Sequence, residues 1–154
     1  VNLYLGQEIY VSRYENIFNS LDNGKLLSMN GVKTVLIEFS MSHRPEEFEE
    51  IVYNLSIRGY KVVVAHVERY TWMSIPDIKF LKAEGAYIQV NSDSLTGKGK
   101  TFREKSMGKK VVKLGLADYI ASDMHHFRRS RLALALKKYD KKGTLNDPSL
   151  FGIN

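Results

Sequence analysis

The sequence predicts an α/β protein built on a parallel sheet, and three observations support that class. Five short apolar segments, rich in valine and isoleucine, alternate with longer segments whose apolar residues recur at helical spacing. Such an alternation is typical of βα units and a parallel sheet. Turn residues such as Asn23-Gly24 and Asn30-Gly31 separate the segments. Acidic residues and histidines follow several of the apolar segments, where strands of this kind would end.

The five predicted strands share an apolar, largely β-branched character. They cover residues 3–11, 33–39, 60–65, 86–90 and 117–121. The third strand contains the uninterrupted apolar run from Val62 to Ala65. A run of this kind is expected in a strand that is buried on both faces, as central parallel strands are.

The helix that begins at Pro45 is the best defined of the predicted helices. Proline suits the first turn, and four glutamates stand near the positive N-terminus of the helix. Its apolar residues keep helical spacing, and Gly59 ends it. The other predicted helices cover residues 14–21, 75–83, 101–113 and 128–139, whereas residues 91–100 and 143–154 are predicted to be irregular.

Composition places residues 1–154 in a single globular domain. No cysteine is present, which excludes disulfides and thiolate chemistry and is compatible with the cytoplasm, where we expect the protein. No apolar run approaches the roughly 20 residues of a transmembrane helix. The net charge of +6 indicates a solvated basic face or attraction to an anion. The basic residues lack the aromatic interleaving of a single-strand binding surface, so we expect no nucleic-acid partner.

Candidate metal ligands stand where the predicted strands end. In parallel α/β folds these ends converge, so we expect the side chains to lie together. Oxygen and imidazole ligands in one set favour Mn²⁺, Fe²⁺ or Zn²⁺. Two such ions about 3.5–4 Å apart can activate water and stabilise charge on a phosphoryl group. The candidates are Glu8, Glu38, His66, Asp123 and His125, and Arg69 could contact a phosphate oxygen.

Other interpretations of single residues stay open. A histidine at a strand end is often a hydrogen-bonded structural residue, and Glu38 could pair with a lysine. Recurrence at four strand ends favours the metal site. We expect His43 to be exposed and Trp72 to pack against the core. The Gly97–Lys100 segment lacks the spacing of a phosphate-binding loop and is expected to be a basic loop.

Four motifs together resemble the PHP (polymerase and histidinol phosphatase) superfamily. They are GQEIYV, VLIEFS, GYKVVVAHVERY and YIASDMHH, in that order. The most similar branch is the bacterial manganese-dependent tyrosine-protein phosphatases of capsular and exopolysaccharide biosynthesis. The resemblance runs from about Leu3 to Arg131. It implies a distorted (β/α)₇ barrel and an enzyme that hydrolyses phosphotyrosine on a tyrosine autokinase with two or three Mn²⁺ ions.

The resemblance also implies roles for individual residues. Glu8 would bridge two ions, and Glu38 with His66 would complete one of them. Asp123 and His125 would serve the others. Arg69 would hold the phosphate together with one arginine of the FRRSR segment, for which we expect Arg129 in preference to Arg128 or Arg131.

The sequence departs from the family pattern in three places. Val67 stands where the family usually has proline, and His126 where it has asparagine. The family also begins with an HxH strand that has no counterpart here. We therefore expect about five of the seven βα units, with an open sheet edge that could associate. Two alternatives stay open: a non-catalytic remnant that binds a partner through its basic C-terminal half, and another PHP phosphoesterase such as a histidinol phosphatase.

Overall fold

Five strands form one parallel sheet in the computed structural model, which describes residues 2–11, 15–97, 101–125 and 129–153. The order in the sheet is the order in the chain, and every neighbouring pair is parallel. The predicted α/β class and its parallel sheet are therefore confirmed. The strands are β1 (Glu8–Tyr10), β2 (Thr34–Glu38), β3 (Lys61–Val64), β4 (Tyr87–Asn91) and β5 (Tyr119–Ala121).

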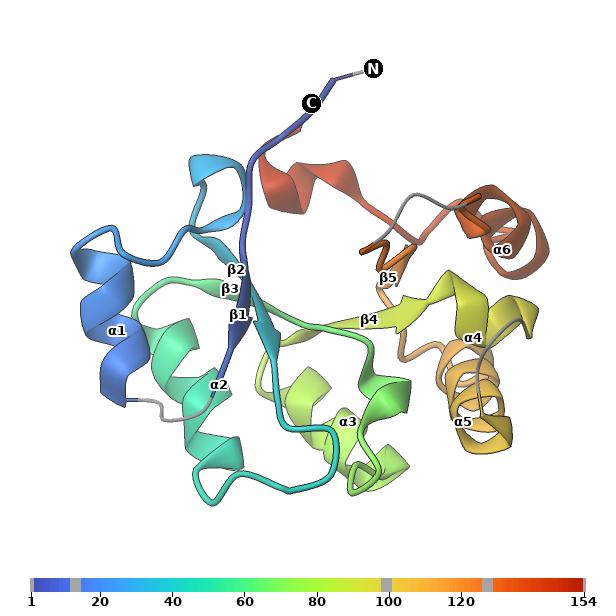
Figure 1. Cartoon of the computed structure of the whole chain (residues 1–154), viewed down its shortest axis with the longest axis horizontal. Helices are drawn as coiled ribbons and strands as arrows, with labels where there is room; N and C mark the ends of the chain where they lie inside the picture. The colour runs from blue at the N-terminus through green and yellow to red at the C-terminus, as the bar shows by residue number, and fades with distance from the viewer. Residues whose placement is uncertain (1, 12–14, 98–100, 126–128, 154) are drawn as a thin grey trace.

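The helices follow the strands as βα units. Because the strand order never reverses, right-handed crossovers place the connecting helices on one face of the sheet. Figure 1 shows α1, α2 and α3 together on that side. The helices are α1 (Glu15–Asp22), α2 (Phe48–Ile57), α3 (Ile75–Ala83), α4 (Ser92–Thr96), α5 (Phe102–Lys113) and α6 (Leu132–Tyr139). The described residues also form three 3₁₀ turns: η1 (Met29–Gly31), η2 (Val67–Arg69) and η3 (Pro148–Phe151).

Several predicted boundaries were wrong. The segment 91–100 was expected to be a loop, yet Ser92–Thr96 is a helix whose first four residues are buried. Helix α2 begins at Phe48, three residues after Pro45, and η3 interrupts the tail that was expected to be irregular. Strand β1 is confined to Glu8–Tyr10, and the leucines that precede it are exposed. Residues 98–100 lie outside the described residues.

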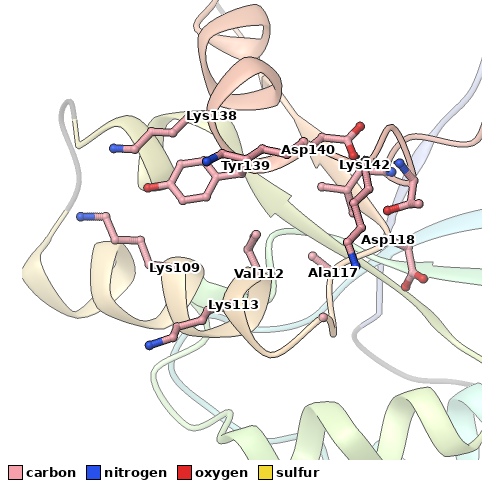
Figure 2. A pocket seen from close by; sticks show the side chains of 13 residues that line it. Lys109, Val112, Lys113, Ala117, Asp118, Lys138, Tyr139, Asp140 and Lys142 are labelled. Atoms are coloured by element: carbon pink, nitrogen blue, oxygen red, sulfur yellow. Dashed lines mark hydrogen bonds between the residues drawn. The ribbon is translucent and has the colours of Figure 1, made fainter.

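A groove of about 790 Å³ opens between α5, α6 and the segment that follows α6 (Figure 2). Ala117 and Asp118, which precede β5, form part of its wall. The groove therefore lies at the N-terminal end of β5. Its remaining lining is rich in lysine: Lys109, Lys113, Lys138, Lys141 and Lys142.

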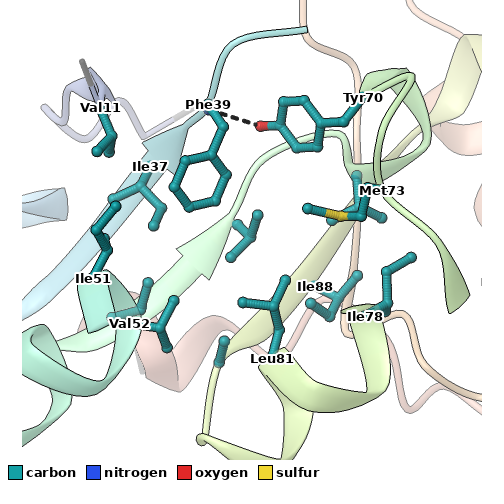
Figure 3. Packing of buried hydrophobic residues seen from close by; sticks show 14 of the residues in the cluster. Val11, Ile37, Phe39, Ile51, Val52, Tyr70, Met73, Ile78, Leu81 and Ile88 are labelled. Atoms are coloured by element: carbon teal, nitrogen blue, oxygen red, sulfur yellow. Dashed lines mark hydrogen bonds between the residues drawn. The ribbon is translucent and has the colours of Figure 1, made fainter. Parts of the chain in front are cut away.

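The core has two sides because side chains alternate across each strand. One side packs the strands against α2 and α3, with Ile37, Ile51 and Leu81 fully buried (Figure 3). The other side is smaller and joins Val63 and Tyr119 to the C-terminal segment. Strand β3 is thus buried on both faces, as its apolar run predicts.

The C-terminal cap of helix α2 directs the chain into β3. Gly59 adopts a left-handed φ of 81°, which glycine reaches without a steric penalty. Its amide donates to the Ser56 carbonyl at 2.9 Å, and the Tyr60 amide donates to the Leu55 carbonyl at 3.1 Å. This is a Schellman motif, which satisfies the last carbonyls of the helix. The chain then enters β3 at Lys61.

An aromatic cluster supports the C-terminal ends of β2 and β3. Phe39 contacts the rings of Phe48, Tyr70 and Trp72 at centroid distances of 5.5, 5.9 and 6.1 Å. The buried Tyr70 hydroxyl accepts a hydrogen bond from the Phe39 amide at 3.2 Å (Figure 3). Trp72 packs against the core and His43 is exposed, as predicted. Among the described residues, no helix is both long and apolar enough to cross a membrane.

Candidate metal centre

Acidic and imidazole side chains gather at one edge of the sheet. Glu38 is the last residue of β2, His66 is the second residue after β3, and Asp123 is the second after β5. Glu8 was expected at the end of its strand, but it is the first residue of β1. The register pairs Tyr10 with Glu38, so Glu8 lies two positions earlier and on the same face of the sheet as Glu38.

Two carboxylates converge on one imidazole nitrogen. His66 Nε2 lies 3.2 Å from Glu8 Oε1 and 3.3 Å from Glu38 Oε1. The imidazole is 1% exposed, whereas the Glu8 and Glu38 side chains keep 27% and 23% of their surface. Glu8, His66 and Asp123 each offer a ligand atom, and these atoms lie within 4.8 Å of one another.

This donor set fits a divalent transition metal. A single N–H on His66 Nε2 can be donated fully to only one of the two carboxylates that face it. A cation placed among these groups would instead draw on the imidazole lone pair and both carboxylates, which is a nitrogen and oxygen set of the kind Mn²⁺, Fe²⁺ and Zn²⁺ accept. His66 Nδ1 is buried without a hydrogen-bond partner in the described part of the chain.

Asp123 joins the cluster to its cationic neighbours. Its Oδ2 accepts from Asn91 Nδ2 at 2.7 Å and from Arg69 Nη1 at 3.2 Å, and its Oδ1 lies 2.9 Å from His125 Nε2. Burial opposes ionisation of Asp123, but His66, the Asn91 hydrogen bond, Arg69 and His125 outweigh it. The pKa of Asp123 is therefore lowered from its ordinary value. These neighbours therefore favour the ionised form of the Asp123 side chain.

The remaining predicted site residues lie farther out. His125 is 66% exposed and reaches the cluster only through its contact with Asp123 among the described residues. Arg129 is exposed, and no contact of the described residues joins it to the cluster. Arg131 is partly buried at the start of α6. Arg128 and His126 lie outside the described residues.

Backbone strain marks two members of the cluster. His66 has φ 29° and Asp123 has φ 47°, which is the left-handed region that residues with a Cβ rarely adopt. Conformations of this kind cost on the order of 1–3 kcal/mol and gather at functional sites. Asn30 and Asn146 are the other two such residues in the described chain.

Two buried polar residues next to the cluster were not predicted. Asn91 ends β4 and donates to Asp123, while the fully buried Glu68 accepts from the Asn91 amide at 3.1 Å and from Ser94 Oγ at 2.6 Å. Burial raises the pKa of Glu68 despite these two hydrogen bonds. The position of Asn91 at a strand end was the available signal, but an amide does not suggest a transition-metal ligand.

Comparison with known proteins places the chain among capsule-associated proteins. The family described as "Capsular polysaccharide synthesis, CpsB/CapC" matches residues 1–145. Tyrosine-protein phosphatase YwqE of Bacillus subtilis is 36% identical over 126 residues, which is 80% of this chain and 48% of YwqE. Tyrosine-protein phosphatase CpsB of Streptococcus agalactiae is 30% identical over 131 residues, which is 80% of this chain and 52% of CpsB.

A solved structure shares the fold. It is described as belonging to YwqE from Bacillus subtilis and CpsB from Streptococcus pneumoniae, "unique metal-dependent tyrosine phosphatases". It superposes with a TM-score of 0.80 at 31% identity, over 89% of this chain and 56% of the other. The chain thus spans about half the length of the curated relatives it matches. On this agreement of sequence and fold, the chain belongs to the CpsB/CapC family of capsular polysaccharide synthesis.

Proposed function

We propose that the protein to which this chain contributes is a metal-dependent enzyme that hydrolyses phosphotyrosine on a protein. The observation that carries the proposal is the convergence of Glu8 and Glu38 on the buried His66, with Asp123 beside them. Family membership and the names of the relatives support it. We further propose that the substrate protein is a tyrosine autokinase that regulates capsule synthesis, as the motif resemblance to the PHP superfamily implies.

The metal ligands we propose are the clustered side chains and their exposed neighbour. Glu8, Glu38 and His66 would hold one part of the metal set, and Asp123 and His125 would hold the rest. We propose Mn²⁺ as the metal, with Fe²⁺ or Zn²⁺ as substitutes that the same donors accept. When bound, such ions would supply an activated water and neutralise charge on the phosphoryl group.

Arg69 is the residue that we propose for phosphate binding. Within the described part of the chain its guanidinium makes one hydrogen bond, from Nη1 to Asp123 Oδ2 at 3.2 Å. Its other two nitrogens can donate to phosphate oxygens, and a planar guanidinium matches two of them at once. Arg69 directly follows Glu68 and is three positions after His66 in the sequence, which keeps it beside the metal cluster. Arg129 is our proposal for the second arginine.

The fold is consistent with part of a barrel. The strands of the sheet follow chain order, and the first helices lie on one face. A segment of a (β/α) barrel has the same strand order and helix placement. We propose that residues 1–154 belong to a single phosphatase domain of this type. We also propose a cytoplasmic location, which suits a chain without cysteine.

The test is metal-dependent phosphatase activity of the purified chain. We expect release of phosphate from a phosphotyrosine peptide and from p-nitrophenyl phosphate with Mn²⁺, and its loss in Glu38→Gln and His66→Ala. Glu46→Gln, at an exposed residue before α2, is the matched control and should keep activity. Activity that needs no metal or survives both ligand variants would refute the proposal. Cleavage of small phosphomonoesters alone would favour the histidinol-phosphatase type of PHP enzyme.

The lysine-rich groove favours a second candidate function, the binding of an acidic peptide segment. Among the described residues, none of the ion pairs involves the five groove lysines. Asp118 is neutralised by Lys82 at 2.7 Å, and Asp140 caps the Thr144 amide at 2.8 Å. Uncompensated positive charge in a groove attracts an anionic chain. This matches the basic C-terminal half that the sequence singles out.

Fluorescence anisotropy with a labelled glutamate-rich peptide tests this second function. We expect binding that weakens with salt and is abolished by Lys109→Glu combined with Lys138→Glu. Lys25→Glu combined with Lys79→Glu changes net charge equally at exposed sites away from the groove, and should leave most of the binding intact. Equal loss in both pairs would show a response to net charge alone and would refute a specific groove.

A further inference from the structure

The turn η2 connects the candidate metal ligand His66 to the candidate phosphate ligand Arg69. It holds only three residues, Val67–Arg69, and begins at His66, whose backbone is left-handed. Inside the turn, a backbone hydrogen bond runs from the Arg69 amide to the His66 carbonyl at 2.9 Å. So short a turn depends on neighbouring elements to hold its shape. Two anchors do so: one side chain from helix α5, and one buried side chain of the turn itself that binds outside it.

The first anchor is Arg103 on α5. Its Nη1 donates to the Glu68 carbonyl at 3.1 Å, and its Nη2 donates to the Tyr70 carbonyl at 2.6 Å and to the Met73 carbonyl at 3.5 Å. Glu68 and Tyr70 are the residues on either side of Arg69. One partly buried guanidinium therefore fixes the carbonyl groups of the residues on either side of Arg69. A planar fork with two donating nitrogens suits this task, whereas a lysine ammonium is a point donor.

The second anchor is the buried side chain of Glu68. It accepts from the Asn91 amide, Asn91 Nδ2 donates to Asp123 Oδ2, and the same Oδ2 accepts from Arg69 Nη1. Because Arg69 follows Glu68 in the chain, these contacts close a ring. The ring fixes both ends of the Arg69 side chain, its backbone through Glu68 and its guanidinium through Asp123.

Helix α5 is held close enough to η2 for Arg103 to reach it. Gly108, one of the buried residues of α5, faces Glu68 and β4. A Cβ placed at Gly108 would lie 3.6 Å from Glu68 Cγ and 3.3 Å from Val90 Cγ1, so only glycine leaves the neighbours undisturbed. The capping box of Thr101 and Glu104 fixes the first turn of α5, where Arg103 stands.

We propose that Arg103 is a positioning residue for phosphate binding, which acts by holding the Glu68 and Tyr70 carbonyls so that Arg69 faces the metal cluster. The inference rests on the proposed function, because it takes Arg69 as the phosphate ligand. It predicts a selective defect. Loss of Arg103 weakens phosphate binding and loosens η2, whereas metal binding by Glu8 and Glu38, which stand on strands, is largely kept.

Two measurements on the purified chain test this role. The first is calorimetric titration with Mn²⁺, and then with inorganic phosphate in saturating Mn²⁺. The second is hydrogen exchange of the amides of residues 67–70, which reports local opening without any need for activity. For Arg103→Gln we expect roughly tenfold weaker phosphate binding and faster exchange at 67–70, with Mn²⁺ affinity within about twofold of wild type. Arg103→Lys keeps the positive charge and a single donor group, so its phosphate affinity and exchange rates should lie between those of wild type and Arg103→Gln.

Lys110→Gln is the matched control, since it removes one positive charge from an exposed position of the same helix. It should behave as wild type in both measurements. Arg103→Gln that matches wild type in exchange and in phosphate affinity would overturn the role, as would an equal loss of Mn²⁺ and phosphate binding in Arg103→Lys. A wild-type chain that binds neither Mn²⁺ nor phosphate would instead refute the proposed function. Even then, hydrogen exchange at residues 67–70 that is unchanged in Arg103→Gln would show that Arg103 does not anchor η2.

Discussion

Replacing Tyr70 with phenylalanine tests how the end of β2 is fixed behind the metal cluster. The Tyr70 hydroxyl is the acceptor for the Phe39 amide at 3.2 Å, and both residues are 0% exposed. Phenylalanine keeps the ring contacts with Phe39 and Trp72 but removes the acceptor. The Phe39 amide, next to Glu38, is then left without that partner in a place that water does not reach.

The cost follows from that unpaired donor. A buried polar group that loses its hydrogen-bond partner destabilises a protein by about 1–3 kcal/mol. With a denaturant slope of about 1–3 kcal/mol per molar urea for a domain of this size, the unfolding midpoint should fall by about 1 M. Trp72, the single tryptophan, stacks on Tyr70 at 5.6 Å and reports the transition by its fluorescence.

Tyr53→Phe is the matched control for this experiment. Tyr53 is 54% exposed on α2, so the same loss of a hydroxyl should change the free energy of unfolding by less than about 0.5 kcal/mol. A Tyr70→Phe midpoint equal to that of wild type, with an unchanged slope, would refute the reasoning. That result would mean that the hydrogen bond makes no net contribution to the free energy of unfolding.

Two further predictions concern the helices around the site. Burial opposes ionisation of Asp77, but hydrogen bonds from Ser74 and the Arg44 guanidinium outweigh it and lower the pKa of Asp77 from its ordinary value. Because folding lowers the pKa of Asp77, the ionised carboxylate stabilises the folded state at pH values above the unfolded-state pKa. This stabilisation is lost as the pH falls through the folded-state pKa. Asp77→Ala should therefore lower the free energy of unfolding by about 1 kcal/mol at pH 7, as measured by urea unfolding. The difference from wild type should shrink below about pH 4. A difference that does not depend on pH would contradict the role of the carboxylate. Gly108→Leu should force α5 away from Glu68 and destabilise by about 1–3 kcal/mol, and an unchanged thermal midpoint would show that α5 does not pack closely there.

The sequence predicted the components of the site better than their arrangement. His66 and Asp123 could be found because acidic and imidazole side chains after apolar strands are costly to bury unless they serve a purpose. The position of Glu8 could not, because it depends on the register of a three-residue strand, which only pairing with β2 defines. The left-handed backbone conformations of His66 and Asp123 could not be predicted from the sequence either, since neither residue type favours that conformation strongly.

The supporting residues were missed for a different reason. Asn91 and Glu68 act through hydrogen bonds to the backbone and to other side chains, and such partners come from tertiary contacts that no local pattern records. Helix α4 was missed because Ser92, Asp93 and Ser94 are typical of loops. Their burial in the fold overrides that preference. Local patterns therefore predicted elements and ligand types, whereas the buried polar network required the structure.

The most direct test of the central claim is calorimetric titration of Mn²⁺ into the purified chain, with the thermal midpoint followed in parallel. Saturable binding is expected in wild type, with stabilisation of about 2.7 kcal/mol when free metal exceeds the dissociation constant a hundredfold. Glu38→Gln and His66→Ala should lose both signals, while Glu46→Gln keeps them. Wild type without a binding signal, or all four proteins with the same signal, would show that these side chains do not form a metal centre.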